Sequence, residues 1–112
     1  MGLGLSVSSA SARGSSFPGG YHFKYRFKYP RIAQNLLCIH RGEGSWSDQG
    51  SPYWGGLQMD LSFQQTYGPH LLKKHGTADH WPVVDQLIVG IHAVLKRGYG
   101  PWLNTARNCG LL

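Results

Sequence analysis

A pair of cysteines, Cys38 and Cys109, constrains the fold of this 112-residue chain more than any other feature. A chain of this length forms about one small domain. A disulfide between the two would tie the last residues to the first third of the chain, and closing so long a loop stabilises a fold by about 4 kcal/mol on the chain-entropy account. Such a bond needs an oxidising compartment, and a pair of buried free thiols is the alternative. Both interpretations stay open at this point.

The start of the chain predicts a leader rather than part of a domain. Residues 1–20 are rich in Gly, Ser and Ala, which is typical of a flexible segment. Residues 1–12 end in an Ala-x-Ala pattern, as the last part of a secretory signal peptide does, but they lack a basic start and a long apolar stretch. They are therefore either a remnant of such a peptide or a plain Ser-rich leader.

Residues 21–29 alternate aromatic with basic or His side chains, and this period of two is typical of a strand. Such a strip can make weak electrostatic contact with an anionic polymer. We expect it to belong to a linker over residues 1–30 rather than to the domain. The domain is then expected to span residues 31–112.

The rest of the chain predicts an α+β, mainly helical fold. Apolar residues recur at helical spacing over residues 31–41, between Pro30 and Gly42. Residues 44–56, rich in Gly and Ser, predict a loop or short hairpin. A short helix is expected over residues 61–67, and residues 70–78 are expected to form an irregular turn.

Asp60 is suited to cap the short helix, and Gly68 and Pro69 to stop it. The last expected helix begins near Pro82 with Thr77 or Asp79 as its cap and ends before Gly98. Its expected buried face holds Val84, Leu87, Ile88, Ile91, Val94 and Leu95. A short aromatic tail follows, and Trp81 and Trp102 are expected in the core.

The composition of the chain excludes several classes of protein and of site. Eleven Lys and Arg against five acids give a formal net charge of +6. No apolar run approaches the roughly 20 residues of a membrane-spanning helix, and the charged fraction of 14% excludes a coiled coil and a highly charged disordered chain. The spacing of His70, His75, His80 and His92 matches no common metal site, so we expect no metal and no cofactor.

Glu43 is the one glutamate of the chain, and it follows the first expected helix between two glycines. Trp46 lies three residues further on. A carboxyl group in a partly apolar pocket has a raised pKa, so we expect Glu43 to be able to act as a general acid. Glycoside cleavage needs such a group to protonate the leaving oxygen. From the residues alone, a solvated glutamate at a helix end remains the alternative.

The segment Cys38-Ile-His-Arg-Gly-Glu43-Gly-Ser-Trp46, followed by Tyr53-Trp54-Gly-Gly-Leu-Gln58, resembles the catalytic domain of resuscitation-promoting factors. It is similar in outline to lytic transglycosylases and goose-type lysozymes, all of the lysozyme-like superfamily. The resemblance continues in Phe63 and Tyr67 and in Gly98-Tyr-Gly-Pro-Trp102 before Cys109. In resuscitation-promoting factors the glutamate directly follows the cysteine, whereas residues 39–42 separate the two here.

The resemblance implies a small lysozyme-like domain with a hairpin or loop beside its cleft, a Cys38–Cys109 disulfide, and secretion or association with the cell wall. It implies cleavage of the β-1,4 bond between N-acetylmuramic acid and N-acetylglucosamine, with Glu43 as general acid and then base. The expected partner is the peptidoglycan glycan strand, bound by a monomer. The residues expected to bind the glycan are Gln58, Tyr53, Trp54, Trp46 and Tyr67.

Two other carboxylates and two other functions stay in view. Asp48 is interpreted as a turn residue and Asp60 as a helix cap, although either could assist Glu43. One alternative function is a non-catalytic module that binds peptidoglycan. The other is a cationic protein that binds nucleic acid or a membrane surface through residues 21–29, although we expect no nucleic-acid partner if the first function holds.

Overall fold

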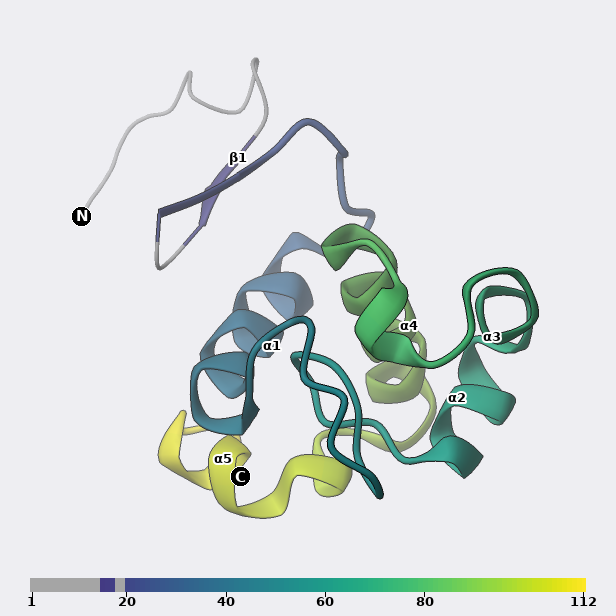
Figure 1. Cartoon of the computed structure of the whole chain (residues 1–112). Coiled ribbons are helices and arrows are strands. Elements are labelled where there is room, and N and C mark those ends of the chain that lie inside the picture. The colour runs from purple at the N-terminus through teal and green to yellow at the C-terminus, as the bar shows by residue number, and fades with distance from the viewer. Residues whose placement is uncertain (1–14, 18–19) are drawn as a thin grey trace.

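The computed structural model describes residues 15–17 and 20–112 of the chain (Figure 1). The predictions for residues 1–14 and 18–19 lie outside these residues. The described part is mainly helical, as expected, and it carries one small antiparallel pair of strands in which Ser16 faces His22. None of its helices is long and apolar enough to cross a membrane. The elements are β1 (Ser15–Phe17), β2 (Tyr21–Phe23), α1 (Pro30–Glu43), α2 (Leu61–Tyr67), α3 (Pro69–His75), η3 (Ala78–His80), α4 (Val83–Arg97), η4 (Gly100–Trp102) and α5 (Leu103–Asn108).

The centre of the core lies between α1 and α4. The apolar stripe expected on the first helix is buried at Ala33, Leu36, Leu37 and Ile39. On α4, Gly90 allows close approach, because a Cβ atom there would lie 2.8 Å from Leu57 Cδ1 and 3.0 Å from Leu36 Cδ1. The buried residues of α4 are Gln86, Leu87, Val89, Gly90, Ile91 and Ala93. Leu95, which we expected in the core, is 51% exposed.

The beginnings of the later helices differ in part from the expectation. Asp60 caps α2 as predicted, since its Oδ1 accepts a hydrogen bond from the backbone N–H of Phe63 at 2.8 Å. The prediction that Thr77 or Asp79 caps the last helix is wrong, because α4 begins after Pro82 without a side-chain cap. Thr77 Oγ1 instead donates to the carboxylate of Asp79 beside η3.

Two helices lie where we expected irregular chain. The expected turn after Gly68 is α3, and the expected aromatic tail contains α5. Proline lies in the first turn of α3 and of the η4 turn that leads into α5, where its missing N–H costs no helical hydrogen bond. The sequence indicated Gly68 and Pro69 as the end of one helix. It did not predict the helices α3 and α5.

A disulfide joins Cys38 of α1 to Cys109 at the end of α5, across a sequence separation of 71. This bond confirms the first interpretation of the two cysteines and excludes free thiols. It holds α5 against the second half of α1, where the two helices are in contact.

The basic and aromatic strip does not behave as one strand or as a free linker. Only Tyr21–Phe23 is strand, so the prediction of an extended strand to Tyr29 is wrong. Phe17, Phe23 and Phe27 are buried and meet edge to face, with ring centroids 5.4 to 5.8 Å apart. These three rings belong to the same buried cluster as the core residues of α1 and α4, so they attach the segment to the domain.

Candidate functional site

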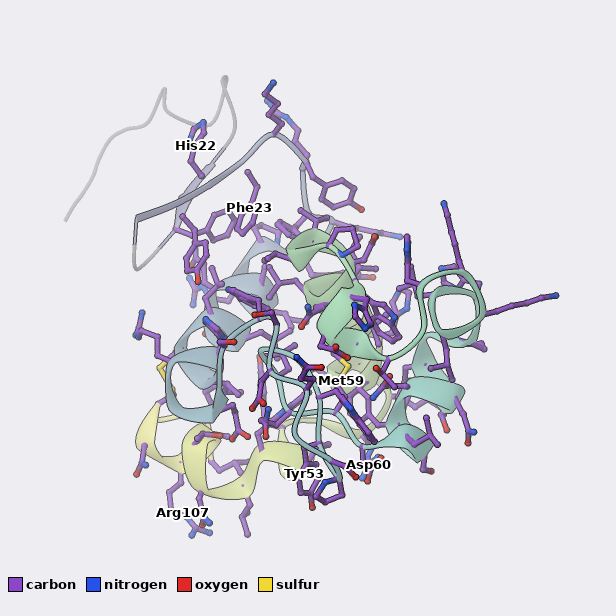
Figure 2. The ribbon with its side chains drawn as sticks, in the orientation of Figure 1. His22, Phe23, Tyr53, Met59, Asp60 and Arg107 are labelled. Atoms are coloured by element: carbon purple, nitrogen blue, oxygen red, sulfur yellow. A yellow bond between two sulfur atoms is a disulfide. The ribbon has the colours of Figure 1, made fainter. Side chains whose placement is uncertain are left out.

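Two adjoining hollows of about 390 and 300 Å³ form one groove beside α2 and α5. They share Tyr53, Gln58, Pro101 and Trp102, which therefore form its middle. Figure 2 places Tyr53 and Asp60 together on this side of the molecule, far from His22. The larger hollow is also lined by Asp60, Ser62, Phe63, Thr66, Tyr67 and Arg97, and the smaller one by Glu43, Leu103 and Asn104.

Glu43 is the last residue of α1 and lines the smaller hollow. Its side chain is partly buried. The Thr105 hydroxyl donates a hydrogen bond to Glu43 Oε2 at 2.6 Å. Glu43 Oε1 has no hydrogen-bond partner among the described residues. One carboxylate oxygen is thus held by the protein, and the other is available to a ligand.

The position of Thr105 follows from the pairing of α1 with α5. Thr105 precedes Cys109 by one helical turn, and Gly42 follows Cys38 by one turn. The disulfide therefore brings Thr105 to the end of α1. Gly42 makes room for it, since a Cβ atom at Gly42 would lie 2.7 Å from Thr105 Cγ2. The helix stop predicted at Gly42 lies two residues early, because α1 ends at Glu43 with Gly44 as its C-cap. Gly42 instead allows this close approach.

Gln58 lies at the tip of a short hairpin that is closed by an antiparallel bridge between Trp54 and Met59. Its φ of 49° is left-handed, which is unusual for a residue with a side chain. Gln58 Nε2 donates to Asp48 Oδ2 at 2.8 Å and to the Gly55 carbonyl at 3.0 Å. Both amide hydrogens are thereby used, so Gln58 presents its Oε1 atom as a free acceptor.

Asp48 is a turn residue, as we predicted. Its Oδ1 accepts a hydrogen bond from the backbone N–H of Gly50 at 3.1 Å, while Oδ2 accepts from Gln58. The carboxylate lies close above the chain after Glu43, because a Cβ atom at Gly44 would be 3.0 Å from Asp48 Oδ2. Glycine at this position thus allows Asp48 and Gln58 to approach the end of α1.

Trp46, which we expected in the binding cleft, does not line the groove. Its ring stacks on His40 with centroids 3.8 Å apart, and its Nε1 donates to the Tyr21 hydroxyl at 2.8 Å. Its carbonyl accepts a hydrogen bond from the buried Gln86 amide. The expectation that the indole forms an apolar wall for the glutamate is therefore wrong, since Trp46 instead connects α1 with the β-strand segment.

The imidazole of His40, which stacks on Trp46, has a shifted pKa. Burial lowers the pKa of His40, the backbone carbonyl of Gly56 opposes this shift, and Arg41 adds to it. His40 Nδ1 lies 2.9 Å from that carbonyl, so it carries the proton and donates. Neutral His40 is the form that the packing favours.

Three of the five predicted glycan-binding residues, Tyr53, Gln58 and Tyr67, line the groove, and the other two do not. Trp54 is partly buried in the hairpin bridge. Trp81 and Trp102 are buried as predicted, although one edge of Trp102 also lines the groove. Trp102 Nε1 donates to the Leu57 carbonyl at 2.7 Å, which fixes this wall.

The sequence did not predict that the site also involves Thr105, Arg97 and Asn104. Thr105 carries a signal that could have been used, because it lies one turn from a cysteine whose partner lies one turn from the glutamate. Arg97 and Asn104 carry none, since their approach to the groove depends on how η4 turns the chain.

Among residues 15–17 and 20–112, no group of three or more His, Cys, Asp or Glu is placed to hold a metal ion. The groove carries two carboxylates, Glu43 and Asp60, each of which accepts a protein hydrogen bond on one oxygen. It also carries the Gln58 amide acceptor, tyrosine faces and the Arg97 cation. No protein-family model matches the chain, and a comparison with curated proteins finds no match either.

Proposed function

We propose that this groove cleaves the β-1,4 bond between N-acetylmuramic acid and N-acetylglucosamine in peptidoglycan, with Glu43 as the general acid. The observation that carries the proposal is the common position of Glu43, Gln58 and Tyr53 around one hollow. These residues come from two separate segments of the resemblance to lysozyme-like transglycosylases, the one that ends at Trp46 and the one from Tyr53 to Gln58. A solvated glutamate at a helix end, which is the alternative interpretation, would not be expected to line a groove together with Gln58 and Tyr53.

The geometry of the carboxyl group fits the acid step. Thr105 holds Glu43 Oε2, so Oε1 is the atom that delivers a proton to the bridging oxygen of the glycan. Bond cleavage then leaves Glu43 as a carboxylate. As a base it can take a proton from water, which gives hydrolysis, or from the 6-hydroxyl of muramic acid, which gives a 1,6-anhydro product.

The surroundings of Glu43 favour a mechanism with one carboxylate. A retaining pair needs a second carboxylate about 5 Å away that is free to act as nucleophile. Both oxygens of Asp48 accept hydrogen bonds. Asp60 caps α2 through Oδ1 and lines the larger hollow, whereas Glu43 lines the smaller one. Assistance by the acetamido group of the substrate requires no second protein carboxylate and is therefore the route that we propose.

The middle of the groove is suited to sugar rings. Tyr53 is 47% exposed and offers a flat face on which a ring can stack. Gln58 Oε1 can accept a hydrogen bond from an acetamido N–H or a hydroxyl group. Tyr67 lines the larger hollow, which extends the groove beyond Gln58. The two hollows together would hold more than one sugar ring.

The disulfide supports a place outside the reducing cytosol, where such bonds persist. Peptidoglycan lies in the same compartment in our proposal, and the protein would act there as a secreted or wall-associated monomer.

The test is the incubation of purified, uncrosslinked glycan strands with the wild type and with Glu43→Gln. We expect muropeptides from the wild type and loss of at least about a hundredfold in rate for the variant. Asp85→Asn is the matched control, because it also replaces a carboxylate by an amide on a residue that does not line the groove. Product mass separates hydrolysis from anhydro formation, since the two differ by one water.

A folded wild type that releases no muropeptide above the Glu43→Gln background would overturn the proposal. If both proteins then sediment equally with insoluble peptidoglycan, the groove belongs to a binding module instead. Thermal unfolding of both proteins shows that the comparison is made between folded chains.

A further inference from the structure

A hollow separate from the groove, of about 160 Å³, lies between the chain before α1 and the surface of α4. It shares no residue with the groove. Figure 1 shows the segment between β1 and α1 on the side of the molecule opposite α5, and Figure 2 places His22 and Phe23 far from Tyr53. The hollow is lined by Tyr25, Phe27, Lys28, Tyr29, Ile88, Ile91 and His92.

The aromatic rings at this hollow are held in place but remain accessible. Phe27 is buried against Phe17 and Phe23 and anchors the segment. Tyr25 packs edge to face on Phe27 at 5.0 Å, yet it is 46% exposed, and Tyr29 is 37% exposed. Exposed rings on an anchored segment can bind a ligand with little further loss of conformational entropy.

The charged residues of the chain segment beside the hollow are all basic. The chain carries no Asp or Glu before Glu43, whereas it carries Lys24, Arg26, Lys28 and Arg31 between the strand and the first turn of α1. Lys24 and Lys28 are exposed, and the ammonium group of Lys28 lies 5.7 Å from the centroid of Tyr29. None of the residues that line the hollow is acidic. A strong positive potential therefore accompanies the accessible tyrosines.

We propose that this hollow binds a phosphodiester-linked polyol chain of the cell wall. The lysine ammonium groups would contact successive phosphates, and the faces of Tyr25 and Tyr29 would pack on the C–H groups of the polyol between them. This choice of polymer rests on the proposed function, which brings the protein to the wall. The site would tether the enzyme near its glycan substrate and leave the groove open, because the two lie on different sides.

Nucleic acid carries the same phosphodiester charge and would suit stacking on tyrosine. The disulfide favours the wall polymer, since it indicates an oxidising compartment. A membrane surface is a poorer fit, because the accessible side chains of the segment are Tyr, Lys, Arg and His rather than aliphatic.

The test measures binding of the full-length protein to purified poly(glycerol phosphate) at low and physiological salt. Lys24→Gln/Lys28→Gln should weaken binding about tenfold and lower its salt dependence, since fewer counterions are released. Lys73→Gln/Lys74→Gln on α3 is the matched control, with the same change of charge at exposed positions away from the hollow. Tyr25→Ser/Tyr29→Ser should weaken binding at both salt concentrations, because it removes contact without removing charge.

Equal losses in the two lysine pairs would overturn the proposal, because they would show attraction to the whole molecule and not to this site. Tighter binding of single-stranded DNA of equal charge would also overturn it. Failure of the proposed polymer binding can be distinguished from failure of the proposed cleavage in the groove. Glu43→Gln should bind the polymer as the wild type does, and Lys24→Gln/Lys28→Gln should cleave polymer-free glycan strands at the wild-type rate.

Discussion

The Thr105 hydroxyl donates a hydrogen bond to Glu43 Oε2 at 2.6 Å, although the two residues are 62 positions apart in the chain. The same hydroxyl lies 3.2 Å from the carbonyl of Trp102. A hydroxyl group has one proton to give, so it serves one of these acceptors at a time. When Glu43 is a carboxylate, Thr105 donates to it. When Oε1 of Glu43 carries the acid proton, Oε2 can still accept from Thr105, so this hydrogen bond can hold the carboxyl group in both of its states.

Thr105 is therefore a positioning residue for the proposed reaction. Replacement by Val keeps the shape of the side chain and removes the donor, so we expect kcat on glycan strands to fall about tenfold with little change in KM. Replacement by Ser keeps the hydroxyl and should retain most of the activity. Steady-state kinetics of both variants make the comparison.

A purely structural role for Thr105 gives a different pattern. In that case Thr105→Ser, which loses the methyl group in contact with Gly42, would be impaired more than Thr105→Val. Equal kcat in Thr105→Val and the wild type would show that the hydrogen bond does not assist the reaction.

Gly42 and Thr105 offer a test of how closely α1 and α5 approach. Gly42→Ala adds a methyl group 2.7 Å from Thr105 Cγ2, so we expect a loss of about 1–2 kcal/mol in the free energy of unfolding and a fall in activity. In the Thr105→Ser background the methyl group that clashes is absent. There, Gly42→Ala should be neutral or stabilise the protein by up to about 1 kcal/mol, because Ala favours a helix over Gly.

Denaturant unfolding of the four proteins in this cycle gives the coupling energy. A coupling near zero would mean that the methyl group of Thr105 does not contact the added Cβ, and that the helices are further apart than the structure has them.

The sequence predicted α1 and α4 well, because each has an apolar stripe at helical spacing with recognisable ends. It predicted α2 because Asp60 and Gly68-Pro69 mark where that helix begins and ends. It also predicted that Asp60 caps α2 and that Asp48 lies in a turn. It failed for α3 and α5, which are short and have few buried residues, so their patterns do not stand out from those of loops. Each packs through one buried residue, Leu71 in α3 and Ala106 in α5, against neighbouring elements that a local pattern does not show.

The site was predictable only in part for a similar reason. Glu43, Tyr53, Gln58 and Tyr67 were proposed from motifs and do line one groove. Trp46 was placed in the cleft because it is near Glu43 in sequence. The helix ends between them, however, and the stacking of Trp46 on His40 is not visible in any local pattern.

Asp48 and Gln58 form a pair whose purpose can be tested. Asp48→Asn replaces one of the two carboxylate oxygens by an NH2 group, which cannot accept a hydrogen bond. The Gly50 N–H and Gln58 Nε2, which each bond to an oxygen of Asp48 in the wild type, then have only one oxygen between them. We expect a loss of about 1–2 kcal/mol in stability and a severalfold fall in cleavage, because Gln58 is no longer held. Loss of cleavage as complete as that of Glu43→Gln would instead make Asp48 a second catalytic carboxylate.

The His40 and Trp46 stack predicts how stability depends on pH. Because burial lowers the pKa of His40 in the folded protein, the unfolded chain takes up a proton first as the pH falls. His40 therefore leaves stability unchanged above about pH 7.5 and reduces it as the pH falls below about 6.5, until the folded protein is also protonated. His40→Gln should be less stable than the wild type at pH 8, since it loses the stack, but it should lose less further stability between pH 7 and pH 5. Urea unfolding at several pH values measures the slopes of His40→Gln and of the wild type, and equal slopes would contradict the neutral, partly buried state assigned to His40.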